Sequence, residues 1–187
     1  MAITTDMIKQ LREATGAGIM DAKRALEAEG GNLEKAKDYL RQQGLAKAGK
    51  KADRDANDGL VDTYIHAQGR IGAMVEVSCE TDFVARTEDF KALTKNVAMQ
   101  VAAMSPRFVN RDDIAEADWA ELEREFGDRD TAAKAVVLAE QDFIRDAKKT
   151  IGNLVTEAVS KMGENIVIRR FARFELGETT AGKTEEA

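Results

Sequence analysis

Hydrophobic residues spaced by three and four predict three short helices within residues 1–43. Glycines follow the first and second helices, and Asn32 has a side chain suited to capping the third. We expect Gly44 to end that third helix. A unit with so few apolar side chains buries little surface and is marginally stable by itself. We therefore interpret residues 1–44 as a three-helix module that docks on a partner.

Alanines, acids and basic residues without a wide apolar face fill residues 45–57, which we expect to form a linker, either helical or irregular. Period-two alternation over residues 60–66 and 70–79, joined by Ala67-Gln68-Gly69, then predicts a β-hairpin. A pairing of His66 with Arg70 places one set of residues on a common apolar face. That set is Val61, Thr63, Ile65, Ile71, Ala73, Val75 and Val77.

Further helices follow the hairpin. A helix is predicted over residues 87–104, and a clear amphipathic helix over residues 151–162 is followed by Gly163. The pattern is weaker between them. It predicts a short helical segment around Trp119 and then a helix through residues 136–144.

The last regular element, residues 166–176, is rich in β-forming residues and is expected to add a third strand to the hairpin. Residues 58–176 thus predict an α+β core with a three-stranded antiparallel sheet packed on helices. Both faces of the last strand carry bulky side chains, so one face is either exposed or contacts another subunit. The polar residues 177–187 are expected to be a disordered tail.

Composition favours a folded, soluble protein. Of the 187 residues, 43% are hydrophobic and 33% are charged, and no apolar run approaches the ~18–20 residues that span a bilayer. The first residues do not resemble a signal peptide, so we expect a cytoplasmic protein without membrane contact. The net charge of −6 argues against general binding to phosphate backbones. A protein partner is expected, and direct nucleic-acid binding is not.

Residues for chemistry are sparse. Cys79 and His66 are the only cysteine and the only histidine, which excludes an intramolecular disulfide and a thiolate metal cluster. In the predicted hairpin they are separated by ~30 Å of strand and lie on opposite faces, so they form no nucleophile and base pair. We interpret Cys79 as a buried core thiol. We expect neither a metal nor a cofactor, and no enzymatic activity.

Thr81-Asp82-Phe83-Val84 lies where a strand is followed by a helix, a common place for exposed functional side chains on a rigid base. The residues alone leave two interpretations open. Phe83 folds beneath the sheet while Asp82 caps a helical turn, or both side chains project toward a partner.

Three segments resemble the bacterial elongation factor Ts family in its short form: LREATGAGIMDAKRAL at residues 11–26, CETDFVAR at 79–86 and GENIVIRR at 163–170. They occur in the family's order within residues 5–176. The resemblance implies a module similar to ubiquitin-associated domains followed by an α+β core. It also implies that the protein is a guanine nucleotide exchange factor and not an enzyme.

The implied partner is GDP-bound elongation factor Tu. Members of the family dock their N-terminal module, near Arg12, Ile19 and Met20 here, on the partner's nucleotide domain. The tip that corresponds to residues 81–84 enters between two partner helices and disturbs the magnesium and phosphate site, so that GDP leaves. Short members pair through their sheets, which implies a homodimer.

Two further expectations follow. Asp142 stands where short members of the family carry proline, and we expect the helix before it to continue through this position. The residues also leave open a different function, in which the helical module recognises a peptide or a ribosomal surface and no nucleotide exchange takes place.

Overall fold

The computed structural model describes residues 3–178, which fall into two compact units. The first unit contains the chain up to Gly59 together with Ser78–Phe90 and Asn153–Val167. The second contains Leu60–Val77, Lys91–Gly152 and the chain from Ile168 onward. The fold is α+β, as predicted, with a three-stranded antiparallel sheet packed on helices.

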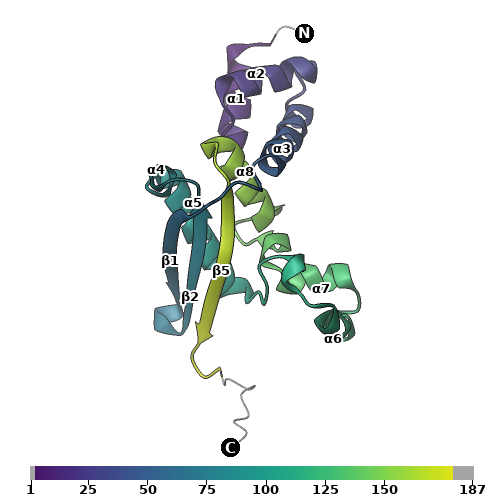
Figure 1. Cartoon of the computed structure of the whole chain (residues 1–187). Helices are drawn as coiled ribbons and strands as arrows, with labels where there is room; N and C mark the ends of the chain where they lie inside the picture. Colours follow the sequence, from purple (N-terminus) through teal and green to yellow (C-terminus); the bar gives the residue numbers. More distant parts are fainter. Residues whose placement is uncertain (1–2, 179–187) are drawn as a thin grey trace, which may run out of the picture. The chain divides into compact units, whose positions relative to one another are not determined.

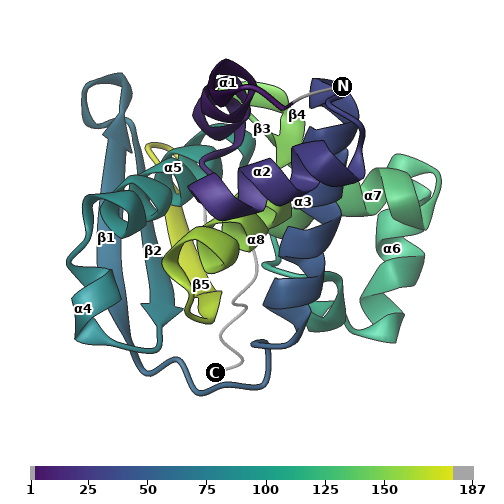
Figure 2. The same cartoon turned by 90° about the horizontal axis from the view of Figure 1, so that it is seen from above.

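The N-terminal helices of the first unit are α1 (Thr5–Thr15), α2 (Ile19–Ala28) and α3 (Leu33–Gly49). They contact one another in Figure 2 and share a small core of buried side chains, formed by Leu11, Ala22, Ala25, Leu26 and Ala36. The side chain of Asn32 accepts a hydrogen bond from the backbone N–H of Lys35, so the predicted cap of the third helix is confirmed. Gly16 ends α1 with a φ of 68°, a left-handed conformation that glycine adopts without steric cost.

The predicted end of the third helix at Gly44 is wrong, because α3 continues to Gly49. Gly44 is buried, and a Cβ atom there would lie 3.8 Å from the Cβ of Ser160 in α8 (Ile151–Met162). Gly44 thus lies inside a helix that packs beside α8, in ordinary van der Waals contact, and does not mark a turn. Alanines at positions 46 and 48 are strong helix formers and carry the helix onward.

The helices that flank the hairpin and the last strand are α4 (Asp82–Ala85), α5 (Glu88–Met104) and α8. The four-residue helix α4 precedes α5, and α8 ends before Gly163, whose φ is 80°. The helices predicted over residues 87–104 and 151–162 are confirmed.

The sheet has the strand order β1-β2-β5, with β1 (Asp58–His66), β2 (Ile71–Cys79) and β5 (Ile166–Glu175) (Figure 1). The hairpin and the third strand are confirmed. A short 3-10 turn, η1 (Ala67–Gly69), joins β1 to β2, and its residues have positive φ angles of 50°, 56° and 90° in order.

The predicted face of the first strand is wrong. Val61 and Ile65 are each 65% exposed, whereas Asp62 faces α5 and accepts a hydrogen bond of 3.1 Å from the Thr94 hydroxyl. A Cβ atom on Gly72 would lie 3.2 Å from the Cδ1 of Ile65, which places both residues on the other face. The prediction assigned the apolar residues of this strand to the core. The face of β1 that packs on α5 instead carries polar residues, and these find hydrogen-bond partners on α5.

In the second strand the prediction holds, because Ala73, Val75 and Val77 are buried. The alternating residue Met74 shares the exposed face with Gly72. In the third strand, Arg173 donates a hydrogen bond to the backbone oxygen of Ala102 in α5, so its neighbour Phe174 lies on the opposite side.

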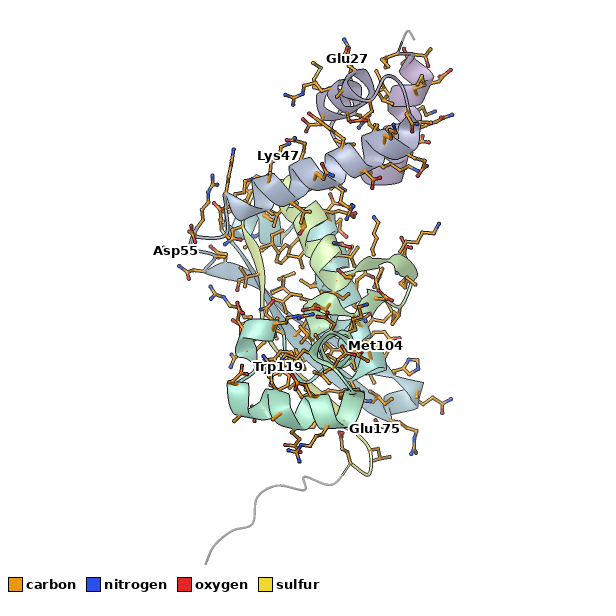
Figure 3. All side chains as sticks on the ribbon, turned by 90° about the vertical axis from the view of Figure 1, so that its right-hand side faces the viewer. Glu27, Lys47, Asp55, Met104, Trp119 and Glu175 are labelled. Carbon is orange, nitrogen blue, oxygen red and sulfur yellow. The ribbon has the colours of Figure 1, made fainter. Side chains whose placement is uncertain are left out.

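The region between α5 and α8 contains α6 (Glu116–Phe126), α7 (Arg129–Val136), β3 (Asp142–Phe143), β4 (Asp146–Thr150) and two 3-10 turns, η2 (Arg111–Asp113) and η3 (Leu138–Glu140). The short helix predicted around Trp119 is confirmed as α6. Trp119, labelled in Figure 3, is buried between α6 and α7, and the guanidinium of Arg129 lies 5.3 Å from the centre of its ring.

The predicted helix through residues 136–144 and across Asp142 is wrong, because α7 ends at Val136 and an antiparallel pair, β3 with β4, follows. Two buried amides account for the change. The side chain of Gln141 donates to the backbone oxygen of Ala135 at 2.8 Å, and that of Gln100 accepts from the backbone N–H of Ile144 at 3.0 Å. These bonds supply hydrogen-bond partners to backbone groups outside regular helices, and the spacing of apolar residues gives no sign of them.

No helix within residues 3–178 is both long enough and apolar enough to cross a lipid bilayer. The expected disordered tail over residues 177–187 lies outside the described residues from position 179 onward.

Candidate functional site

Phe83 is the most exposed large apolar side chain of the described residues, with 84% of its surface accessible. It belongs to α4, which begins directly after β2 and the residues Glu80 and Thr81. The interpretation in which this ring folds beneath the sheet is therefore wrong. Asp82 is not the cap either, because the Thr81 hydroxyl accepts the hydrogen bond from the backbone N–H of Val84 at 3.4 Å.

The base of this helix is fixed although its ring is exposed. Ala85 is buried, and Val84 is half-buried. The hydroxyl of Thr87 donates to the backbone oxygen of Val84 at 2.8 Å and accepts from the backbone N–H of Phe90 at 3.2 Å. These contacts hold the junction of α4 with α5, so the Phe83 ring projects from a rigid support.

Asp82 lies next to the ring and is also exposed. Its carboxylate forms an ion pair of 2.6 Å with Arg86, one turn further along the chain. Exposed pairs of this kind stabilise a protein by only ~0–1 kcal/mol. The carboxylate can therefore exchange this partner for another at little cost.

Two glutamates hold the backbone beneath the tip, by which we mean residues Thr81 to Val84. The carboxylate of Glu164, in the turn after α8, accepts from the backbone N–H groups of Glu80 and Thr81 at 3.1 and 3.0 Å. The carboxylate of Glu80 accepts from the backbone N–H of Asn165 at 2.6 Å. That bond is the main reason why the pKa of Glu80 is lowered, and the nearby guanidinium of Arg54 adds to the effect.

Sequence reasoning did not select Glu80, Glu164 or Asn165 as site residues. Both carboxylates belong to segments that resemble the family, at residues 79–86 and 163–170. Their place in these segments was the one sign in the sequence that they contribute to the site. Their mutual contact could not be read from positions 84 residues apart.

The three residues expected to dock on the partner, Arg12, Ile19 and Met20, are all exposed. Ile19 and Met20 are the first two residues of α2, and the Nε of Arg12 donates to the backbone oxygen of Ala17 at 3.2 Å. They therefore cluster at the turn between α1 and α2. This cluster and the tip both belong to the first unit.

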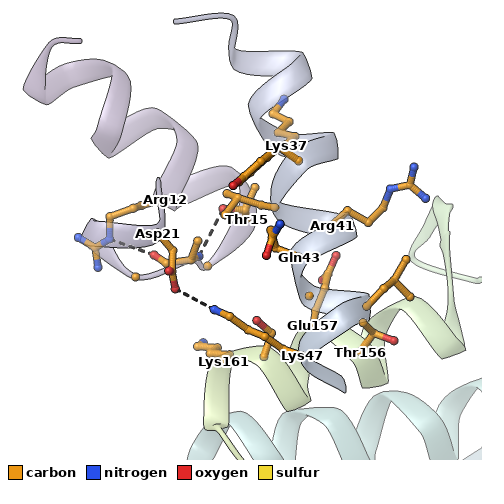
Figure 4. Close-up of a pocket in the computed structure, with 18 of the residues that line it drawn as sticks. Arg12, Thr15, Asp21, Lys37, Arg41, Gln43, Lys47, Thr156, Glu157 and Lys161 are labelled. Carbon is orange, nitrogen blue, oxygen red and sulfur yellow. Dashed lines mark hydrogen bonds and ion pairs between the residues drawn. The ribbon is translucent and has the colours of Figure 1, made fainter. Parts of the chain in front are cut away.

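A cavity of about 430 Å³ lies beside this turn (Figure 4). Its lining includes Asp21 of α2, Lys47 of α3 and Lys161 of α8. Burial raises the pKa of Asp21, but hydrogen bonds from Arg24 and Lys47 outweigh it, and the pKa is lowered overall. Lys161 forms an ion pair of 2.7 Å with Asp89. Asp21, Lys47 and Lys161 are thus each paired within the protein, and the ion pair of Asp21 with Lys47 joins α2 to α3.

Cys79 is fully buried, as predicted, and its thiol donates to the backbone oxygen of Thr81 at 3.2 Å. Burial is the main reason why the pKa of this thiol is raised, so the reactive thiolate is disfavoured. Within residues 3–178, no group of three or more His, Cys, Asp and Glu side chains is arranged to hold a metal ion.

Comparisons with known proteins agree with this picture. Residues 46–135, which include the tip, match the family model described as elongation factor TS. The chain is 48% identical to elongation factor Ts of Carboxydothermus hydrogenoformans, over 98% of this chain and 94% of that protein. It is also 48% identical to elongation factor Ts of Thermoanaerobacter sp. strain X514, over 94% of this chain and 96% of the relative. Elongation factor Ts of Heliobacterium modesticaldum is 47% identical, over 98% of this chain and 94% of its own length.

Proposed function

Because the chain belongs to the elongation factor Ts family, and is thus a translation elongation factor, we propose that it is the guanine nucleotide exchange factor for elongation factor Tu. It binds the GDP-bound partner and promotes the release of GDP. It acts by binding and not by making or breaking covalent bonds, so it is not an enzyme.

The observation that carries this proposal is the exposure of Phe83 on a fixed support. A ring with 84% of its surface accessible contributes little to the stability of its own chain. Burying such a ring in a partner is worth ~1.5–3 kcal/mol. Exposed aromatic anchors with a rigid base are typical centres of protein interfaces.

Energies indicate that the tip acts together with a second contact. A nucleotide held with nanomolar affinity is bound by ~12 kcal/mol, far more than one phenylalanine supplies. The factor lowers this affinity only if it binds the nucleotide-free partner more tightly than the GDP-bound one, because such coupling is reciprocal. Arg12, Ile19 and Met20 provide the second contact by docking on the partner's nucleotide domain.

In the proposed mechanism, Asp82 and Phe83 enter between two helices of the partner and displace its magnesium ion. That ion would balance part of the negative charge on the GDP phosphates, so its loss would weaken the binding of GDP. The carboxylate of Asp82 is suited to this step because it is exposed and its ion pair with Arg86, another exposed residue, is easily exchanged.

We further propose that two copies of the chain pair through the exposed face of the sheet. Four large apolar side chains from three strands lie on that face, namely Val61, Ile65, Met74 and Phe174. Large apolar side chains gathered on one exposed face are a common mark of protein interfaces. A two-fold axis through the sheet would bury each patch against its own copy, which is the usual geometry of homodimers.

A direct test uses stopped-flow fluorescence. Elongation factor Tu loaded with a fluorescent GDP is mixed with excess unlabelled GDP, with and without the protein, and the rate of fluorescence loss is measured. We expect the protein to accelerate release in proportion to its concentration until saturation. No acceleration would overturn the proposal. A lack of acceleration together with co-elution of the protein with ribosomes would favour the alternative, in which the helical module recognises a peptide or a ribosomal surface.

A further inference from the structure

The carboxylate of Glu164, in the turn Gly163-Glu164-Asn165, binds the two residues that lead from β2 into α4. One oxygen of Glu164 accepts from the backbone N–H groups of Glu80 and Thr81, at 3.1 and 3.0 Å. The other accepts from the hydroxyl of Thr81 at 2.6 Å. Hydrogen bonds to an ionised acceptor are about twice as strong as those between neutral groups. Glu164 is half-buried, so water competes only partly for these bonds.

The Thr81 hydroxyl serves two neighbours at once. Its hydrogen points to Glu164, which leaves its oxygen to accept from the backbone N–H of Val84 at 3.4 Å. That second bond caps α4. A helix of four residues is not stable without such contacts, because forming the first turn is unfavourable. Glu164 therefore orients the group on which the helix that carries Phe83 depends.

The same turn also fixes the segment that follows α3. The side chain of Asn165, 5% exposed, donates to the backbone oxygens of Ala52 and Arg54 at 3.2 and 2.8 Å. Lys51 donates to the backbone oxygen of Gly163. The chain that leaves the helical module and the chain that enters the tip are thus bound to three consecutive residues.

We propose that Glu164 is a positioning residue for nucleotide exchange. It holds Thr81 so that α4 stays formed and Phe83 keeps one orientation before the partner arrives. A ring that is already oriented loses less conformational freedom on binding, and this saving appears as a faster release of GDP. This inference rests on the proposed function and assigns to it a residue outside the tip.

Two substitutions separate positioning from general stability. Glu164→Ala removes all three bonds to the entrance of the tip. Glu164→Gln keeps an oxygen that can accept from both backbone N–H groups, and its amide can donate to the oxygen of Thr81. Glu121→Ala, at an exposed site in α6, is the matched control for loss of a glutamate.

Two measurements are made on each full-length variant. The first is the maximal rate of GDP release from elongation factor Tu at saturating factor. The second is backbone hydrogen exchange, which reports the opening of individual segments. We expect Glu164→Ala to slow release about tenfold, a factor that corresponds to ~1.4 kcal/mol. We expect faster exchange in residues 82–86 but not in α1–α3. Glu164→Gln should restore most of the rate, and Glu121→Ala should match the wild type.

A folded Glu164→Ala variant that promotes GDP release from elongation factor Tu at the wild-type rate would overturn the inference. So would a slow variant whose hydrogen exchange in residues 82–86 is unchanged. If Glu164→Ala does not fold, Thr81→Val decides the question, because it replaces only the hydroxyl with a methyl group, and a rate of GDP release equal to that of the wild type would then overturn the inference. If the wild type does not accelerate GDP release from elongation factor Tu, the proposed function fails. Hydrogen exchange alone then still decides whether Glu164 orders the tip.

Discussion

The backbone N–H of Asn165 donates a hydrogen bond of 2.6 Å to the carboxylate of Glu80, and this bond makes the unfolding free energy depend on pH. It is the largest cause of the lowered pKa of Glu80, ahead of the attraction of Arg54. A carboxyl whose pKa is lowered by folding stabilises the protein above its unfolded pKa. That contribution is lost as the pH falls through the folded value.

We therefore predict that the wild type loses more stability in acid than Glu80→Gln does. Glutamine keeps an acceptor for Asn165 but carries no charge to titrate. Urea unfolding at a series of pH values from about 7 to about 3 should show the difference between the two proteins shrinking below about pH 5, near the unfolded pKa of a glutamate. Glu121→Gln, at an exposed site, should run parallel to the wild type. A constant difference between Glu80→Gln and the wild type at every pH would contradict the prediction.

Phe83→Ala should abolish most of the exchange activity and leave stability unchanged. The ring is 84% exposed, so its removal should alter the free energy of unfolding by no more than ~0.5 kcal/mol. The loss of an anchor that is buried in the complex should slow GDP release by tenfold or more, as expected for a loss of at least ~1.4 kcal/mol. Stopped-flow release and urea unfolding measure the two effects.

Ile144→Ala provides the control for that experiment. This residue is an exposed large apolar side chain in the second unit, between β3 and β4. Its truncation should leave GDP release unchanged. If GDP release from elongation factor Tu is as fast with Phe83→Ala as with this control, the tip does not drive nucleotide exchange.

Ile65→Glu should convert the proposed dimer to a monomer. Ile65 is 65% exposed in one chain, so the substitution should not disturb the fold, whereas a buried carboxylate facing its own copy is strongly unfavourable. Light scattering after size-exclusion chromatography should give about twice the chain mass of 20.5 kDa for the wild type and the single mass for the variant. Ile144→Glu should stay dimeric. A wild type that is monomeric at micromolar concentration would remove the basis for sheet pairing.

The elements with strong local signals could be predicted from the sequence. Regular apolar spacing predicted α1, α2, α5 and α8, and period-two alternation predicted the hairpin. The exposure of Phe83 could not be chosen from the residues alone, because a phenylalanine after a strand is more often buried. It was the resemblance to a family that favoured the exposed alternative.

The errors share a physical cause, which is that distant partners override local pattern. Asp62 lies on the helix side of its strand because Thr94 and Lys95 from α5 satisfy its carboxylate. Apolar alternation alone assigned that side to Val61 and Ile65. The extended backbone after Val136 likewise depends on the buried amides of Gln100 and Gln141. Neither contact can be deduced without the positions of both partners.

Gly44 illustrates the same limit in a helix, and it leads to a prediction with a built-in comparison. The sequence suggested a helix end, whereas the structure places this glycine inside α3. A Cβ atom at position 44 would have its nearest neighbour at 3.8 Å, an ordinary van der Waals separation. A Cβ atom on Gly152, in the first turn of α8, would lie 2.9 Å from the backbone oxygen of Ala139.

Gly44→Ala should therefore stabilise the protein, and Gly152→Ala should destabilise it. Alanine in a helix interior is favoured over glycine by ~1 kcal/mol, and at position 44 no clash offsets this gain. At position 152 the backbone oxygen must move, which costs ~1–3 kcal/mol as in other overpacked sites. Urea midpoints of the two variants should shift in opposite directions from the wild type. A midpoint for Gly44→Ala below that of the wild type would mean that α3 and α8 approach more closely than their separation at Ser160 indicates.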